Sequence, residues 1–288
     1  MDVVNVTGSQ PSRPQDPQAM WLVGCGNMAG AMVQGWRSAG LDLSQAVAIR
    51  PSGTPVEGVR TVRSIAEAGA APGVAVLGFK PQKLREVAPQ FASAIGEGTV
   101  VLSLLAGAEV ETLRARFPRA AAVVRVMPNL AVAIRRGVTA VFGEPLSEEQ
   151  RSRVAALLGP LGYVAWCAGE AELGAIGHVA GSGPAYVARF IAALASAGEG
   201  KGLDPGLALT IARETVLGTG WLAAADADEP LEELARRVTS PNGTTQAGLE
   251  VLDAELPNLI ERTITAAGRR SAELAAAARD IDSVPVRP

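Results

Sequence analysis

Histidine and cysteine are almost absent from this chain of 288 residues, which has one histidine, His178, and two cysteines, Cys25 and Cys167. A multi-histidine metal centre is therefore excluded, and a zinc site would need most of these three residues together with carboxylates. A nucleophile–histidine–acid triad would have to use His178. Two cysteines far apart in sequence do not make a disulfide framework, which favours a reducing cytoplasm. We expect no metal site, and we expect the chemistry to come from a bound cofactor or from the backbone.

Excess charge and long apolar runs are missing as well. The chain has 26 basic and 29 acidic residues and a net charge of -3, so nothing in its charge favours a nucleic acid or an anionic membrane as partner. The uncharged stretch from Leu173 to Ala188 contains several glycines and a proline and is too short to span a membrane. Residues 1–19 are polar and rich in proline, without the apolar core of a signal peptide, and are expected to form a disordered tail.

Short apolar runs alternate with helix-length segments in residues 20–167. The strand candidates are Met20–Val23, Ala46–Ile49, Val74–Phe79, Val100–Leu104, Ala122–Val126 and Thr139–Phe142. The helix candidates include Ala29–Ala39, Gln82–Ile95, Val110–Arg116 and a helix that starts at Ser147 and ends near Gly159. Continuous apolar strands between helices are typical of a parallel sheet covered on both faces. We therefore predict an α/β Rossmann domain with a doubly wound, mostly parallel sheet over residues 20–167.

Strand signals stop after Cys167, where alanine, leucine and glycine dominate. Apolar spacings of three and four predict helices over Ala185–Ala197, Leu207–Ala225, Leu231–Val238 and Leu259–Ala278. Asp204-Pro205 supplies one of them with an N-cap and a proline at its first position. The apolar surface of these helices exceeds what one small bundle can bury. We predict an all-α domain over residues 168–288, and its excess of apolar surface favours oligomerisation.

A dinucleotide-binding fingerprint follows the first predicted strand, in the segment Gly24-Cys-Gly-Asn-Met-Ala29. In such a loop Gly24 makes the tight turn, Gly26 lets the backbone approach a pyrophosphate, and Ala29 permits close packing of helix on strand. The predicted cofactor contacts in this loop are Gly24, Gly26, Asn27, Met28 and Ala29. We interpret Cys25 as a packing residue of the loop rather than as a reactive thiol.

The end of the second predicted strand bears on the choice of dinucleotide. NAD-binding domains usually carry an acidic residue there, which holds the ribose 2′-hydroxyl. This chain has Arg50-Pro-Ser52 instead, and Arg50 with Ser52 suits a 2′-phosphate. The prediction is NADPH, with NADH as a weaker cofactor; a solvated surface arginine is the alternative interpretation of Arg50.

Several motifs together resemble the pyrroline-5-carboxylate reductase family. They are Gly24–Ala29, Phe79-Lys-Pro-Gln82, Met127-Pro-Asn129, Gly181-Ser-Gly-Pro-Ala-Tyr186, Val238-Thr-Ser-Pro-Asn-Gly-Thr-Thr245 and Arg270-Ser-Ala-Glu273-Leu274. The resemblance runs from Met20 to Leu274. The chain departs from the family pattern at Leu130-Ala131, at Gly177 and at Glu214. These departures leave the identity of the cyclic imine open.

The resemblance implies NADPH-dependent reduction of 1-pyrroline-5-carboxylate to L-proline, the last step of proline biosynthesis. The alternatives are a reductase of a related cyclic imino acid and a non-catalytic NADP-binding regulatory protein. The resemblance also implies a homodimer built from the C-terminal helices, and it leaves open a ring of such dimers. The residues implied to face the cofactor from later strand ends are Lys80, Met127, Pro128 and Asn129; a surface lysine and a turn asparagine are the alternatives.

The substrate carboxylate is expected to bind backbone N–H groups in the segment from Ser240 to Thr245, which combines small residues and hydroxyls before a helix. An ordinary Asn-Gly turn with a hydroxyl cap is the alternative for this segment. The residues implied to bind substrate are Ser182, Gly183, Ser240, Gly243, Thr244 and Thr245. Thr245 is the implied catalytic residue, which orients the imine first and donates a proton second. We interpret Tyr186 and His178 as packed helix residues.

Overall fold

The computed structural model describes residues 19–283. The tail predicted for residues 1–19 therefore lies outside the described residues, except for its last position. The chain divides into two compact units, of which the first runs to Gly181 and takes in the chain again from Ser271, while the second is Ser182–Arg270. The predicted domain boundary after residue 167 stays a prediction. Within the described residues, no helix combines the length and apolarity needed to cross a membrane.

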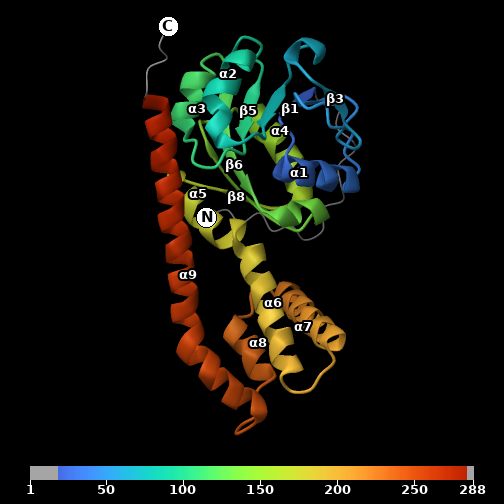
Figure 1. Ribbon diagram of the computed structural model, residues 1–288, viewed down its shortest axis with the longest axis vertical. Helices are drawn as coiled ribbons and strands as arrows, with labels where there is room; N and C mark the ends of the chain where they lie inside the picture. The colour runs from blue at the N-terminus through green and yellow to red at the C-terminus, as the bar shows by residue number, and fades with distance from the viewer. Residues whose placement is uncertain (1–18, 284–288) are drawn as a thin grey trace. The chain divides into compact units, whose positions relative to one another are not determined.

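One eight-stranded sheet forms the centre of the first unit, in the order β3-β2-β1-β4-β5-β6-β7-β8 (Figure 1). Its strands are β1 (Met20–Val23), β2 (Ala46–Ile49), β3 (Arg60–Val62), β4 (Val74–Leu77), β5 (Val100–Ser103), β6 (Ala122–Pro128), β7 (Gly137–Gly143) and β8 (Gly162–Trp166). The first six strands are parallel in the doubly wound order, in which the chain turns back at β1 and β4. The predicted Rossmann fold is confirmed.

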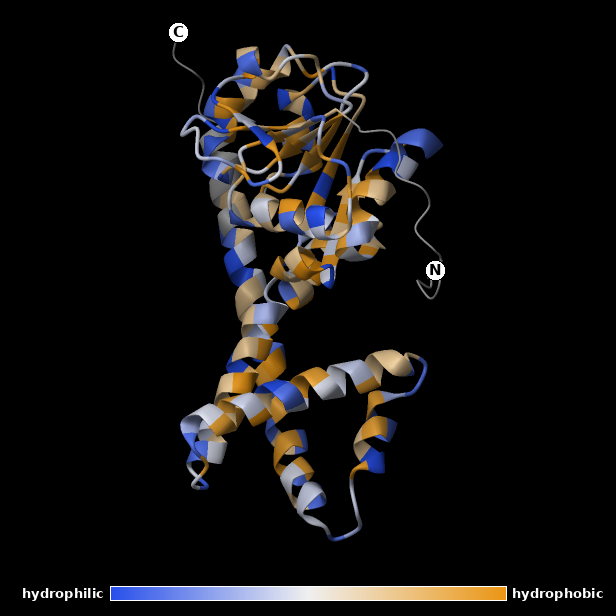
Figure 2. Ribbon diagram, turned by 90° about the vertical axis from the view of Figure 1, so that its right-hand side faces the viewer, coloured by the Kyte–Doolittle hydropathy of each residue, from blue (hydrophilic) through white to orange (hydrophobic). Residues whose placement is uncertain are grey.

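Successive residues of each strand point to opposite faces of the sheet, where they belong to two separate hydrophobic cores. On one face, residues such as Leu22 and Val76 pack under α1 (Asn27–Ser38) and α4 (Glu148–Leu158). On the other, residues such as Trp21 and Leu77 pack under α2 (Leu84–Ala92) and α3 (Val110–Arg116). The four strands β1, β2, β4 and β5 are buried along their whole length, which explains their continuous apolar sequences (Figure 2).

Two strands at the sheet edges escaped prediction, for different reasons. Strand β3 has only three residues and begins with an exposed arginine, so it lacks an apolar run. Strand β8 lies at the other edge, where none of its residues is fully buried. Strand β7 is longer than the predicted Thr139–Phe142 and runs antiparallel to β6. At Gly162 the first residue of β8 has a φ of +136°, and a Cβ there would lie 2.1 Å from the carbonyl oxygen of Gly137.

Helix starts in the first unit agree with the capping chemistry of the sequence. Ser147 caps α4 through a capping box with Gln150: the Ser147 Oγ accepts from the Gln150 N–H and the Gln150 side chain accepts from the Ser147 N–H. Short 3₁₀ turns connect the remaining elements, namely η1 (Ile65–Glu67), η2 (Pro81–Lys83), η3 (Leu130–Ile134) and η4 (Gly159–Leu161). After β8 the chain forms α5 (Glu170–Ile176) and one π-helical turn, η5 (Gly177–Gly181).

The second unit is entirely helical, so the prediction of an all-α C-terminal half is confirmed. Its helices are α6 (Gly183–Glu199), α7 (Pro205–Ala225), α8 (Leu231–Arg237) and the part of α9 (Thr244–Ser283) up to Arg270. Helices α6 and α7 pack side by side through small residues, among them the buried Ala195, Ala208 and Ala212. The Asp204 carboxylate caps α7 as predicted, since it accepts from the N–H groups of Gly206 and Leu207.

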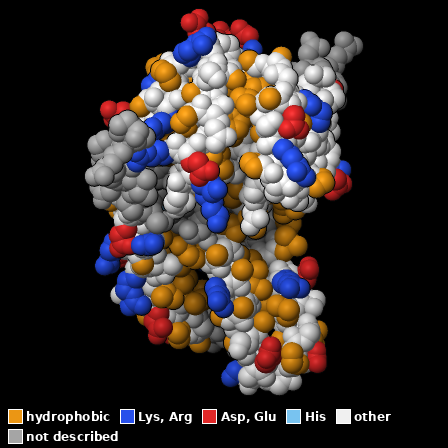
Figure 3. Space-filling model, turned by 45° about the horizontal axis from the view of Figure 1, so that its top comes forward, with side chains coloured by type: hydrophobic (Ala, Val, Ile, Leu, Met, Phe, Trp, Pro, Cys, Tyr) orange, Lys and Arg blue, Asp and Glu red, His pale blue; other side chains and the backbone are white. Residues whose placement is uncertain are grey.

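Helix α9 begins 15 residues before the predicted Leu259, because Pro257 lies inside it without ending it. Many apolar side chains of the helical unit stay exposed, and Figure 3 shows apolar side chains on the surface of the molecule. Those of the second unit are Val187, Phe190, Leu194, Leu203, Leu207, Ile211, Leu217, Trp221, Leu222, Leu231, Val238, Val251, Leu252, Leu259 and Ile260.

Candidate functional site

The loop between β1 and α1 has the geometry of a phosphate-binding turn. Gly24 has a φ of +74°, which favours glycine, and a Cβ at this position would lie 3.0 Å from the Cβ of Phe79. Gly26 is the N-cap residue of α1, and no side chain caps the helix. The first turn also contains no acidic residue. The N–H groups of this turn and the positive end of the helix dipole can therefore bind an anion.

Within the described chain, no close protein contact requires a glycine at position 26. A Cβ at this position would lie 3.8 Å from the Gly78 carbonyl oxygen, its only protein neighbour within 4 Å among the described residues. This distance is an ordinary van der Waals contact, so the surrounding protein would tolerate alanine at position 26. The geometry agrees with the predicted role of Gly26, close approach of the backbone to a pyrophosphate.

Gly78 is a residue of this site that sequence analysis missed. A Cβ at Gly78 would lie 2.8 Å from the Gly24 carbonyl oxygen and 2.9 Å from the Cβ of Ala29. The Gly78 N–H also donates to the carbonyl of Val23 at 2.9 Å. The phosphate loop therefore lies directly on the end of β4. The available signal was a glycine inside the predicted strand Val74–Phe79, which often marks the close approach of another backbone.

The turn after β2 contains the residues that were predicted to select the dinucleotide. The Arg50 guanidinium donates to the Thr54 carbonyl at 2.9 Å, and the Gly53 N–H donates to the Arg50 carbonyl at 2.8 Å. The hydroxyls of Ser52 and Thr54 lie 2.9 Å apart. Residues 50–54 thus form a closed turn with one arginine and two hydroxyls and no carboxylate. This composition suits a phosphate better than a ribose 2′-hydroxyl.

Lys80 and Asn129 follow the carboxyl ends of β4 and β6. Lys80 precedes η2 as its N-cap and is exposed. Asn129 is buried, and its side chain binds backbone groups of the first unit: Oδ1 accepts from the N–H groups of Ala131 and Val138 at 3.2 Å, and Nδ2 donates one hydrogen bond to the carbonyl of Ala180 at 3.0 Å. Asn129 therefore holds together η3, β7 and η5, as a turn asparagine does.

The departure at Gly177 has a local structural reason. A Cβ at Gly177 would lie 2.1 Å from the sulfur of Met127, so the thioether occupies the space of a side chain at 177. The other departure, Leu130-Ala131, begins η3, where the Leu130 side chain is largely exposed. Met127 and Pro128 are the last two residues of β6, beside Asn129.

The cysteine and the histidine near these loops are buried to different degrees, Cys25 fully and His178 partly. Cys25 is buried, and this burial raises the pKa of its thiol, although the charge of Arg50 acts in the opposite direction. His178 lies in η5, and its Nε2 is buried without a hydrogen-bond partner in the described part of the chain. Among the side chains that the structure describes, no group of three or more His, Cys, Asp or Glu is arranged to hold a metal ion.

In the second unit the segment Ser240–Thr245 forms a tight turn into α9. The Gly243 N–H donates to the Ser240 carbonyl at 2.9 Å, and Asn242 has a φ of +55°. The first turn of α9 contains no acidic residue, and the side chains of Thr244 and Thr245 are exposed. The start of this long helix can bind an anion such as a carboxylate.

The remaining predicted substrate residues lie at the start of α6. Ser182 is its N-cap residue and Gly183 its first residue, followed by Pro184. The Ser182 carbonyl accepts from the N–H groups of Ala185 and Tyr186 at 3.0 and 3.3 Å. Tyr186 is partly buried in this helix. The prediction that this motif starts the first helix of the C-terminal half is confirmed, and the roles of its residues stay predictions.

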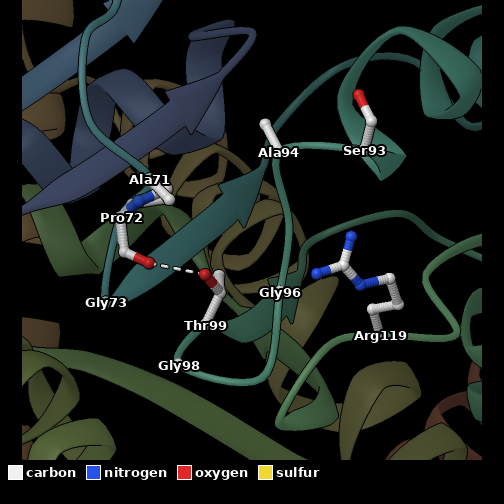
Figure 4. A pocket seen from close by; sticks show the side chains of 9 residues that line it. All are labelled: Ala71, Pro72, Gly73, Ser93, Ala94, Gly96, Gly98, Thr99 and Arg119. Atoms are coloured by element: carbon white, nitrogen blue, oxygen red, sulfur yellow. Dashed lines mark hydrogen bonds between the residues drawn. The ribbon is translucent and has the colours of Figure 1, made fainter.

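A hollow of the first unit lies at the amino ends of β4 and β5, on the side of the sheet opposite to the phosphate loop (Figure 4). Its lining includes Gly73, Gly98 and Arg119, and the Thr99 hydroxyl donates to the Pro72 carbonyl there at 2.6 Å. Because ligands of doubly wound sheets bind at the carboxyl ends of the strands, this hollow is not the candidate site.

Comparisons with known proteins bear on the same two regions. The family described as pyrroline-5-carboxylate reductase dimerisation matches residues 170–274. The pyrroline-5-carboxylate reductase of Pseudomonas aeruginosa is 36% identical over 262 residues, which cover 88% of this chain and 96% of the relative. Pyrroline-5-carboxylate reductase 2 of Bacillus subtilis is 34% identical over 264 residues, which cover 88% of this chain and 94% of the relative.

Solved structures agree in fold over almost the whole chain. The pyrroline-5-carboxylate reductase of Coxiella burnetii superposes with a TM-score of 0.82 at 28% identity, and the match covers 90% of this chain and 99% of that one. The pyrroline carboxylate reductase of Plasmodium falciparum, a structure with NADP bound, shares the fold with a TM-score of 0.79 at 21% identity over 90% of this chain and 98% of that one. The resemblance drawn from the motifs is confirmed, and the chain belongs to the pyrroline-5-carboxylate reductase family.

Proposed function

We propose that this protein reduces 1-pyrroline-5-carboxylate to L-proline with NADPH, the last step of proline biosynthesis. The observation that carries the proposal is the 36% identity to a pyrroline-5-carboxylate reductase over 96% of that relative's length. The reaction adds a hydride to the imine carbon and a proton to the imine nitrogen of the substrate. The hydride comes from NADPH, so no nucleophilic side chain is required.

The residues of the first unit fit such a cofactor. The Gly24–Ala29 loop presents uncapped N–H groups to a pyrophosphate, and the absence of a Cβ at Gly26 leaves room for it. Arg50 and Ser52 would hold the 2′-phosphate, in a turn that has no carboxylate to repel it. Lys80 and the segment Met127–Asn129 complete the proposed cofactor contacts from the ends of β4 and β6. Asn129 contributes by positioning, since its own side-chain groups bind backbone.

The residues of the second unit would hold the substrate. The N–H groups at the start of α9, from Gly243 to Thr245, are proposed to bind the substrate carboxylate, with the Ser240 carbonyl fixing the turn. Thr245 would orient the imine through its exposed hydroxyl, and Ser182 and Gly183 would contribute the start of α6. Orientation of this kind can lower a barrier by as much as about 7–11 kcal/mol.

A homodimer formed through the helices of the second unit is also part of the proposal. The match of residues 170–274 to a dimerisation family and the exposed apolar side chains of α6, α7 and α9 support it. Isolated monomers rarely leave so many apolar side chains exposed. Larger rings of dimers stay a prediction. Both cysteines are free, which supports the reducing cytoplasm as the compartment.

The function is tested by following NADPH oxidation with a panel of cyclic imines that includes 1-pyrroline-5-carboxylate. The proposal expects the highest kcat/KM for this substrate. A higher value for another imine would make the protein a related reductase, and turnover of none would make it a cofactor-binding protein.

Thr245 is tested in the same assay. Thr245→Ala should lower kcat/KM for the imine about tenfold or more without changing NADPH affinity, since a hydrogen bond to the reacting group is lost. Thr245→Ser keeps the hydroxyl and should retain most of the activity. Equal values for wild type and Thr245→Ala would remove Thr245 from the site.

Dimerisation is tested by sedimentation equilibrium of the full chain. Ile211→Glu on α7 should weaken the dimer, because it places a charge among exposed apolar side chains of the second unit. Ile134→Glu is the matched control, since Ile134 is equally apolar and is exposed on the first unit. A monomeric wild type would refute the dimer.

A further inference from the structure

Two arginines leave neighbouring strands at the same level of the sheet. Strands β2 and β3 are parallel, with Ile49 opposite Val62. Arg50 and Arg63 are therefore the first residues beyond the two strand ends, and the Arg50 N–H donates to the Val62 carbonyl at 2.8 Å. The carboxyl edge of β3 thus adds a positive charge next to the turn proposed for the 2′-phosphate.

Gly53 brings the Arg63 side chain onto that turn. A Cβ at Gly53 would lie 2.7 Å from Nε and 3.1 Å from one terminal nitrogen of Arg63, so the guanidinium occupies the space that a side chain at 53 would take. Gly53 has a φ of +69°, which favours glycine for the backbone as well. The turn of residues 50–54 is therefore contacted by two guanidinium groups, that of Arg50 through the Thr54 carbonyl and that of Arg63 over Gly53.

The loop between β2 and β3 contains a second glycine with an arginine side chain over it, but this arginine has an ion pair. Gly58 has a φ of +77°, and a Cβ there would lie 2.5 Å from Nε of Arg37. The Arg37 guanidinium, however, pairs with the Glu57 carboxylate at 2.8 Å, and the side-chain hydrogen bond from Arg37 lowers the pKa of Glu57. This arginine closes the loop and its charge is neutralised.

Arg63 has no such ion pair among the residues that the structure describes. The carboxylate nearest along the chain, Glu67, accepts from the Ser64 hydroxyl at 2.7 Å and from the Arg63 N–H at 3.5 Å. Arg60, at the start of β3, is bound to the carbonyls of Glu67 and Ala68 and is not free to move. Arg63 therefore differs from Arg37, because its guanidinium lies over Gly53 with no carboxylate at ion-pair distance in the described chain. The lowered pKa of the Glu67 carboxyl is due first to the hydrogen bond from Ser64 and to a smaller extent to the charge of Arg63.

We infer that Arg63 is a second 2′-phosphate-binding residue of this protein, which selects NADPH over NADH together with Arg50 and the hydroxyls of Ser52 and Thr54. The inference rests on the proposed function, because it assumes that NADPH is the cofactor. Two arginines that contact one turn repel each other unless an anion lies between them, and a phosphate dianion supplies two charges. Planar guanidinium groups are also well suited to bind phosphate through paired hydrogen bonds.

The inference is tested by calorimetric binding of adenosine 2′,5′-bisphosphate and of adenosine 5′-monophosphate to the full chain. These ligands differ in the 2′-phosphate and require no turnover. Arg63→Ala should raise the Kd of the bisphosphate about tenfold, the value of one exposed charge-assisted contact, and leave the Kd of the monophosphate unchanged. Arg63→Lys keeps the charge but loses the paired hydrogen bonds, and should give an intermediate Kd. The ratio of kcat/KM for NADPH and NADH should fall by the same factor as bisphosphate binding.

Arg119→Ala is the matched control, since Arg119 is also exposed on the first unit but lines the hollow at the amino ends of β4 and β5 (Figure 4). It should leave all four constants unchanged. If Arg50→Ala weakens the bisphosphate and Arg63→Ala does not, the inference is wrong and the proposed function stands. If the wild type binds bisphosphate no more tightly than monophosphate, the NADPH assignment fails together with the inference.

Discussion

Substitution of Gly78 by alanine tests how the phosphate loop is held. The added Cβ would lie 2.8 Å from the Gly24 carbonyl oxygen and 2.9 Å from the Cβ of Ala29, both in the loop and helix that are proposed to bind the pyrophosphate. Both distances fall short of ordinary contact by about 0.5 Å. Neither neighbour is the flexible end of a side chain, so the backbone of the loop must move.

Two effects of this movement can be measured separately. Overpacking of a well-packed site costs about 1–3 kcal/mol, and a loss of about 2 kcal/mol would lower the melting temperature by roughly 4–8 °C. Displacement of the loop N–H groups by about 0.5 Å should also raise the Kd for NADPH about tenfold, the equivalent of about 1.4 kcal/mol. Thermal unfolding gives the first quantity, and titration of NADPH fluorescence gives the second.

Gly98→Ala is the control, because a Cβ at Gly98 meets no atom within 4 Å and its φ is not positive. This variant should bind NADPH like the wild type and should unfold at the same or a slightly higher temperature. Wild-type Kd and melting temperature for Gly78→Ala would refute the close packing of loop on strand. A lower melting temperature with unchanged Kd would separate the packing from the cofactor site.

Three further predictions concern the rest of the first unit. Gly35→Ala should cost about 3 kcal/mol in urea unfolding, because a Cβ there would lie 2.2 Å from the Val132 carbonyl oxygen; an unchanged midpoint would contradict the contact. The Arg114 guanidinium holds the pKa of Glu144 below its ordinary value, so the stabilisation is present above the unfolded pKa of about 4.5 and is lost as the pH falls through the folded pKa. Glu144→Gln should therefore flatten the loss of stability measured between about pH 5 and pH 3, and an unaltered pH profile would count against the pair. Cys25, buried with a raised thiol pKa, should resist alkylation by iodoacetamide in the native protein until urea unfolds it, and rapid native labelling would show that it is accessible.

The parts of the fold that could be predicted from sequence are those where one face or both faces of an element are buried. Strands β1 and β2 were predicted with their bounds, because every residue of each is buried and apolar. Strand β8 was missed although four of its five residues are apolar; it lies at an edge of the sheet, where none of its residues is fully buried. The predicted start of α9 at Leu259 was too late, because the helix continues through Pro257 from Thr244. Burial therefore decided which elements the sequence reveals.

The candidate site divides in the same manner. The Gly24–Ala29 loop could be predicted because its chemistry is local, a turn followed by the start of a helix. Gly78 was missed although it lies inside a predicted strand, since the contacts that require glycine come from Gly24 and Ala29, which are far away in sequence. Arg63 was missed for the same reason: only the register of β2 and β3 brings it to the turn at Arg50. Contacts that arise only from the pairing of two strands do not appear as a periodic pattern in the sequence.

The reversed strand β7 determines where the first unit ends. Because β7 is antiparallel to β6 and β8 is parallel to β7, the chain leaves β8 on the side where the parallel strands begin, opposite to the phosphate loop. The 7 residues of α5 and the 5 of η5 then return it to the carboxyl end of β6, where the Ala180 carbonyl accepts from Asn129. Helical turns of this length span roughly 17 Å, and one inserted residue would rotate the next helical residues by about 100°. Insertions and deletions should therefore be excluded between Glu170 and Gly181.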